Sequence, residues 1–141
     1  GANGVTVIAD KTISDIDADD AEWLIVPGGM PGATNLASCG KLSDMLSVQW
    51  NKQGKIAAIC AAPAVVLGPL GIVRGQDCTC YPSFKDDLVS AGGQYMDMRV
   101  VESGNLITAN GPSSALLFAF AIVANTLGPD VASSVASGML V

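Results

Sequence analysis

Residues 56–67 have the sequence IAAICAAPAVVL, in which a short apolar strand runs directly into a helix with Cys60 at the junction. Pro63 falls in the first turn of the expected helix, where a missing N–H costs nothing. A thiol at such a junction faces the first amides of the helix and the positive end of its dipole, and both favour the thiolate. Because the chain has no histidine, an in-chain Cys–His pair is excluded. Chemistry at Cys60 would therefore rest on backbone amides or on a carboxyl group.

Apolar strands and helices alternate outward from this junction. Residues 23–26 are continuously apolar, as in a parallel strand that is covered on both faces. Residues 98–101 and 106–109 flank Ser-Gly-Asn and predict a hairpin. We also expect strands over 5–9 and 77–81, and helices over 41–53, 85–91, 113–127 and 130–137. The pattern predicts a single α/β domain, residues 1–141, with a mainly parallel sheet and no internal repeat.

Composition excludes several classes of function. The net charge of -6 argues against a nucleic-acid partner, because that affinity depends on Lys and Arg. The apolar stretch 115–124 is too short to span a bilayer, so we expect helix 113–127 to be buried or to lie at a subunit interface. The first residues do not resemble a signal peptide. Four cysteines without regular spacing favour a reducing compartment, the cytosol.

Two loops form the candidate site. In open parallel sheets, ligands bind beyond the carboxyl ends of the strands, where Gly28-Gly29 follows one expected strand and Cys60-Ala61 the next. We expect the amides of Gly29 and Ala61 to face one small pocket and to stabilise a thiolate or an oxyanion.

Plainer interpretations stand beside this one. Cys60 is equally compatible with a small buried hydrophobe. Cys39, Cys78 and Cys80 are expected to be structural, since Cys-x-Cys alone says little about metal. The acidic stretch 15–22 is expected to be a solvated loop, and we predict no metal site.

Several motifs resemble the ThiJ/PfpI superfamily, and within it the parkinsonism-associated deglycase (glyoxalase III) branch. They are AAICAAPA at 57–64, VPGGMPGA at 26–33, Tyr81-Pro82 followed by Lys85-Asp86, and NGPS at 110–113. They extend over essentially the whole chain, in order and with similar spacing.

The resemblance implies a flavodoxin-like (class I glutamine amidotransferase-like) three-layer sandwich that forms homodimers and needs no cofactor. It implies that Cys60 is the nucleophile and that the amides of Gly29 and Ala61 surround the thiolate. The same likeness places Gly28, Met30, Tyr81 and Pro112 around the pocket. Tyr81 matches a position where some members carry a histidine, so a His-assisted version is excluded here.

The activity implied is conversion of methylglyoxal or glyoxal, or repair of glycated proteins, through a Cys60 hemithioacetal. Thus the expected partner is a small reactive aldehyde or a glycated protein, with neither nucleic acid nor membrane involved. The alternative is a redox-sensing chaperone or oxidative-stress signalling protein that oxidises Cys60 without turnover.

Members of the superfamily normally begin with a β-α-β unit that this sequence does not match. We therefore expect the sheet to have an unpaired inner edge. The glutamate that bonds the thiol in the family lies in that unit, and no residue here matches it. Our hypothesis is that Gly1 is not the natural start. Either the polypeptide is cleaved and a separate N-terminal fragment of it stays associated as a partner, or the first segment is missing from this sequence.

Overall fold

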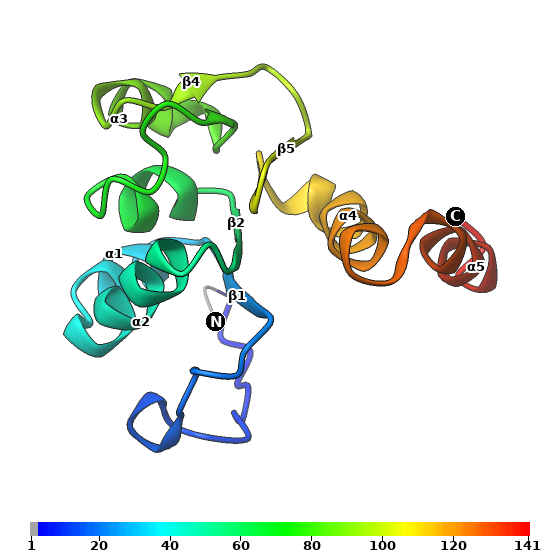
Figure 1. Cartoon of the computed structure of the whole chain (residues 1–141), viewed down its shortest axis with the longest axis horizontal. Helices are drawn as coiled ribbons and strands as arrows, with labels where there is room; N and C mark the ends of the chain where they lie inside the picture. The colour runs from blue at the N-terminus through cyan, green and yellow to red at the C-terminus, as the bar shows by residue number, and fades with distance from the viewer. Residues whose placement is uncertain (1–2) are drawn as a thin grey trace.

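The computed structural model describes residues 3–141, which form a central sheet with helices on both faces (Figure 1). In chain order the elements are η1 (Ile13–Asp15), β1 (Trp23–Val26), α1 (Gly32–Ala37), α2 (Gly40–Asn51), β2 (Lys55–Ile59), η2 (Pro63–Leu67), β3 (Asp77–Cys78), η3 (Pro82–Phe84), α3 (Lys85–Ser90), β4 (Gln94–Tyr95), β5 (Val100–Ser103), β6 (Leu106–Ala109), η4 (Pro112–Ser114), α4 (Ala115–Leu127) and α5 (Pro129–Gly138).

The main sheet has the strand order β1-β2-β6-β5. β2 lies between β1 and β6 and is parallel to both, whereas β5 and β6 form an antiparallel hairpin. β3 and β4 pair in a separate two-stranded sheet. The predicted mainly parallel α/β architecture is therefore confirmed, and β1 forms an edge of the sheet, as expected.

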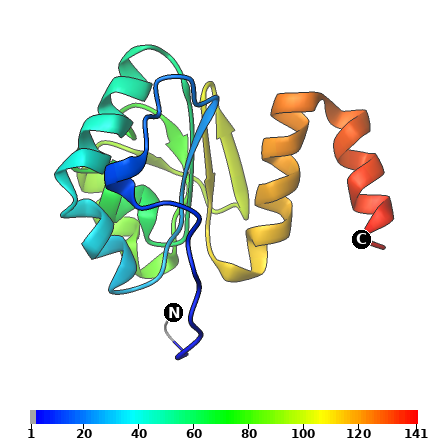
Figure 2. The same ribbon diagram turned by 90° about the horizontal axis from the view of Figure 1, so that it is seen from below.

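Strand β2 supplies apolar side chains to both faces of the sheet. Ile56 and Ala58 belong to the core on the side of α1, α2 and η2, whereas Ala57 packs with Phe118 of α4 on the other side. This follows from the two-residue period of a strand. Figure 2 shows the resulting layers, with α1 and α2 on one side of the sheet, α4 on the other, and α5 packed beyond α4.

A buried glutamine fastens α2 to the starts of β1 and β2. Gln49 Nε2 donates to the carbonyl oxygens of Ala21, Glu22 and Lys55 at 3.2, 3.2 and 3.1 Å. A Cβ atom at Gly54 would lie 2.5 Å from Gln49 Cδ, so glycine there makes room for the amide. This contact holds the parallel strands in place and thereby aligns their carboxyl ends.

Most of the expected helices and the hairpin are confirmed within two residues at each end. The hairpin turn is Gly104-Asn105, because Ser103 pairs with Leu106, and Gly104 takes the positive φ of 59° that such a turn requires. Helix α1 was not predicted, because its six residues are too few to show a helical period.

Two strand predictions were wrong in extent or in existence. Residues 5–9 form no strand, and Val7 and Ile8 are 82% and 92% exposed. β propensity expresses packing on a neighbouring strand, and the ladders of the described strands do not include residues 6–9. The strand expected over 77–81 ends at Cys78, because the Thr79 amide donates to Thr108 Oγ1 and the Tyr81 amide to the Cys60 carbonyl.

The apolar helix was expected to be buried or to lie at a subunit interface, and within this single chain it is only partly buried. Phe118 is its buried residue, whereas Leu116, Leu117 and Leu127 are 38%, 41% and 63% exposed. The helix lies in an outer layer and is covered on one side by the sheet and on another by α5, so its remaining surface faces outward. Among the described residues, no helix combines the length and the apolar character needed to cross a membrane.

Candidate functional site

Cys60 lies immediately after β2 in a backbone conformation that is unusual for a residue with a side chain. Its φ is +67°, in the left-handed region. The Cys60 amide donates to the Ala109 carbonyl at 2.8 Å, and the Cys60 carbonyl accepts from the Tyr81 amide at 2.8 Å. These two hydrogen bonds hold a conformation that costs about 1–3 kcal/mol. The thiol-bearing residue is partly exposed.

The Gly28-Gly29 turn packs directly against Cys60. A Cβ atom on Gly28 would lie 2.5 Å from Cys60 Cβ, 2.6 Å from the Ile59 oxygen and 3.2 Å from the Ala61 nitrogen. Gly29 has a φ of +86°, which glycine adopts without strain. Because Val26 and Ala58 are paired in register, the loops that follow β1 and β2 meet at the same end of the sheet.

The two amides predicted to act as donors have no backbone acceptor in the described loops and turns. None of the backbone hydrogen bonds outside the helices and strands of residues 3–141 is donated by the N–H of Gly29 or Ala61. Ala61 is only 1% exposed, and an unpaired N–H in a buried residue is rare in folded proteins. Both groups are therefore free to bind an anion or a polarised oxygen beside Cys60.

The helical segment expected after Cys60 is present as a short turn. It is the π-helical turn η2, with Pro63 in its first turn as expected. Pro69 follows closely and has no N–H to continue a helix. A five-residue turn carries less dipole than a full helix, so the argument from the helix dipole weakens. Single π turns often occur at functional sites.

Two further loops complete the surroundings of Cys60. Tyr81 is 44% exposed and is joined to Cys60 through its amide. Its ring atom Cδ2 lies 3.4 Å from the position of a Cβ on Gly111, and Pro112 follows at the start of η4. Of the predicted lining residues, Gly28 and Tyr81 thus contact Cys60, and Pro112 lies in the adjoining turn. Met30 is 48% exposed in the loop after Gly29, with Sδ 3.9 Å from Thr34 Oγ1.

The four cysteines form two groups, one buried and one partly exposed. Cys78 and Cys80 are fully buried, and burial is the main reason why their thiol pKa values rise to about 11 and about 12. Cys39 and Cys60 are partly exposed. Within the described residues no cluster of three or more His, Cys, Asp or Glu side chains could hold a metal ion.

A polar network that we did not predict braces the turn over residues 110–114. Arg99 donates through Nε to Ser114 Oγ at 3.3 Å and through Nη2 to the Ser113 carbonyl. Ser114 Oγ donates to the side-chain oxygen Oδ1 of Asn110 at 2.6 Å. The backbone N–H of Asn110 donates to the Arg99 carbonyl at 3.0 Å. The signal that could have revealed it is the hairpin register, which places Arg99 opposite Asn110.

The chain matches known proteins over nearly all of its length. The model of the DJ-1/PfpI family matches residues 1–125. Protein DJ-1 homolog A of Arabidopsis thaliana is 32% identical over 98% of this chain, which spans only 35% of that relative. Glutathione-independent glyoxalase DJR-1.2 of Caenorhabditis elegans is 37% identical over 94% of this chain and 70% of its own length.

A solved structure is similar in fold as well as in sequence. The structure of oxidized Toxoplasma gondii DJ-1 has a TM-score of 0.92 with this chain at 35% identity, over 99% of this chain and 74% of that one. This likeness confirms the expected flavodoxin-like α/β fold.

Proposed function

Because the chain belongs to the DJ-1/PfpI family, we propose that Cys60 is the nucleophile of a cofactor-free conversion of methylglyoxal, glyoxal or related aldehyde adducts to hydroxy acids. This is an activity of the glyoxalase III or protein deglycase type. The observation that carries the proposal is the position of Cys60, which is in left-handed conformation after β2, with the Gly28-Gly29 turn packed against it and the Ala61 amide next to it. The relative named as a glutathione-independent glyoxalase supports the same class of reaction.

The proposed reaction begins when the Cys60 thiolate adds to the aldehyde carbon and forms a hemithioacetal. The amides of Gly29 and Ala61 donate to the new alkoxide oxygen, which lowers the barrier because they are already oriented. A proton then moves from the former aldehyde carbon to the adjacent carbonyl carbon, which leaves a thioester. Water hydrolyses the thioester and releases the 2-hydroxy acid and the Cys60 thiol.

Proton transfer needs an acid–base group. We propose that a carboxyl group of the hypothesised N-terminal fragment has this role. Strand β1 offers that fragment an edge of the sheet, where Ile25 is 53% exposed.

The test measures methylglyoxal consumption and lactate formation by the purified protein, assayed together with the N-terminal fragment that supplies the carboxyl group, and by its Cys60→Ser variant under the same conditions. The Cys39→Ser variant is the matched control, because it removes the other partly exposed thiol. We expect turnover to be lost only in Cys60→Ser. Equal turnover by both variants would refute the proposal.

Oxidation of Cys60 is the second candidate function. The similar Toxoplasma gondii structure is described as oxidized, and Cys60 is accessible where Cys78 and Cys80 are not. Two equivalents of peroxide would convert the thiolate to a sulfinate, with release of water. A mass gain of two oxygens on Cys60 without aldehyde turnover would favour this function.

We further propose a cytosolic homodimer that uses the exposed apolar surface of α4. Leu116 and Leu127 supply part of that surface. Light scattering over a range of concentrations tests the stoichiometry, and fractionation of cells tests the location.

A further inference from the structure

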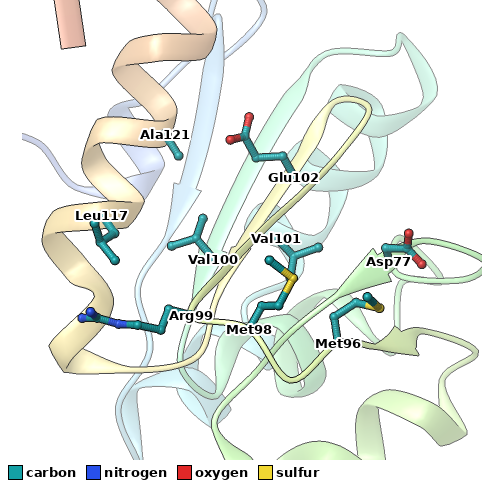
Figure 3. A pocket seen from close by; sticks show the side chains of 9 residues that line it. All are labelled: Asp77, Met96, Met98, Arg99, Val100, Val101, Glu102, Leu117 and Ala121. Carbon is teal, nitrogen blue, oxygen red and sulfur yellow. The ribbon is translucent and has the colours of Figure 1, made fainter. Parts of the chain in front are cut away.

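A groove of about 610 Å³ lies between β5, α4 and the small sheet, away from Cys60. Figure 3 shows Arg99 and Leu117 on the side of α4, with Asp77 and Met96 on the side of β3 and β4. Its volume is within the range of ligand-binding sites. Neither the proposed chemistry nor the family resemblance assigns it a role.

The floor of the groove is a strand edge whose hydrogen-bonding groups point outward. β5 is last in the sheet order and pairs only with β6 among the described strands. Because the Asn110 amide donates to the Arg99 carbonyl, Arg99 and Asn110 form a hydrogen-bonded pair. Such pairs alternate along an antiparallel ladder. The main-chain groups of Val100 and Glu102 therefore face the groove, where they resemble the binding edge of domains that accept an added strand.

The side chains along this edge indicate the chemistry of the occupant. Met96, Met98 and Leu117 are 37%, 53% and 41% exposed and offer flexible apolar contacts. Asp77 and Glu102 contribute two carboxylates. The guanidinium of Arg99 keeps its positive charge but is directed to Ser113 and Ser114. Asp77 and Glu102 outnumber it in the lining, so the groove carries a net negative charge.

We propose that this groove binds an extended segment of a partner protein, which adds a strand beside β5. The segment would carry apolar side chains against Met98 and Leu117 and a lysine or arginine near Asp77 and Glu102. Opposite charge at these positions selects the segment, and main-chain hydrogen bonds supply affinity. Binding is independent of the Cys60 thiol.

The probe is a fluorescein-labelled peptide, Thr-Val-Lys-Val-Thr-Val-Thr, titrated with the whole chain by fluorescence anisotropy. Val100→Pro removes an outward N–H and leaves the β5–β6 ladder intact, a substitution that edge strands tolerate. We expect about a tenfold weaker Kd, equivalent to loss of one hydrogen bond. Val100→Ala is the matched control and keeps the N–H, so the Kd should change by less than about threefold.

A second variant tests the proposal without placing a proline in β5. Glu102→Lys should weaken binding of the lysine peptide by about tenfold and strengthen binding of the same peptide with glutamate in place of lysine. Equal affinities of Val100→Pro and Val100→Ala would overturn the proposal, as would no binding of the probe at about 1 mM protein. Dimer formation that excludes the probe would also overturn it, because the occupant would then be a second copy of the chain.

Discussion

Gly28 lies so close to Cys60 that a Cβ atom at position 28 would come within 2.5 Å of the Cys60 Cβ atom. This contact joins the loops after β1 and β2, which are neighbouring parallel strands. The Ala61 nitrogen lies 3.2 Å from the same Cβ position. The candidate site is thus created by backbone atoms that approach closely, and only glycine permits the approach.

Gly28→Ala is expected to separate the two loops. The added methyl group would contact Cys60 Cβ and the Ile59 oxygen, so we expect a loss of about 1–3 kcal/mol in the free energy of unfolding. Alkylation of Cys60 should also slow. The control is Gly32→Ala, where nothing lies within 4 Å of the new Cβ. Denaturation curves and iodoacetamide rates check both effects, and equal behaviour of the two variants would count against the contact.

The cysteines should differ in their reactivity. In the native protein at neutral pH we expect iodoacetamide to modify Cys60 and Cys39, because these two are partly exposed. Cys78 and Cys80 are buried and have raised thiol pKa values, so they should react only after unfolding. Peptide mass spectrometry after alkylation distinguishes the four sites. Rapid native labelling of Cys80 would contradict the burial described here.

The same two thiols predict how stability depends on pH. Their folded pKa values, about 11 and about 12, lie above the ordinary value of 9.0. Their contribution to stability is therefore fully present below about pH 9 and is lost as the pH rises toward 12. The double substitution Cys78→Ala and Cys80→Ala should flatten this decline in urea denaturation curves. An unchanged decline would assign it to other groups.

The sequence predicted the architecture better than it predicted burial at the edges. The apolar run around Ala57 and the hairpin around Gly104 follow from local periodicity and turn chemistry, and both were confirmed. The segment 5–9 has the residues of a strand, yet strand formation needs a partner, which local composition cannot reveal. Likewise, α4 is apolar on every side, but which of its faces is covered depends on the elements packed beside it.

Within the site, local motifs placed Gly28, Cys60 and Tyr81 in contact. The π-helical form of η2 was not predicted, because an apolar run after a strand does not distinguish a π turn from an α-helix. The brace from Arg99 to Ser114 joins residues that only the folded hairpin brings together.

Gln49→Leu should destabilise the protein although leucine is apolar and fits a buried site. Leucine keeps most of the volume but leaves the carbonyl oxygens of Ala21, Glu22 and Lys55 without their shared donor. We expect a loss of about 1–3 kcal/mol in the free energy of unfolding. The loss is limited because leucine also removes Gln49 Oε1, which is buried without a hydrogen-bond partner among the described residues. Gln94→Leu at an exposed position is the control and should change stability by less than about 0.5 kcal/mol. A similar midpoint for both variants in urea would show that Gln49 is not needed as a clamp.

Ser114→Ala tests the brace beside Cys60. Ser114 is fully buried, and its hydroxyl accepts from Arg99 Nε and donates to Asn110 Oδ1. Without this oxygen, Arg99 Nε loses its acceptor and Asn110 Oδ1 loses its donor. The free energy of unfolding should fall by about 1–2 kcal/mol. Because the Ala109 carbonyl that precedes this turn anchors the Cys60 amide, the rate of Cys60 alkylation should change as well. Ser113→Ala is the matched control: Ser113 is exposed and only its backbone oxygen takes part, so that variant should keep both stability and alkylation rate. If Ser113→Ala and Ser114→Ala behaved alike, the turn would be held by its backbone alone and the side-chain network would have no effect on Cys60.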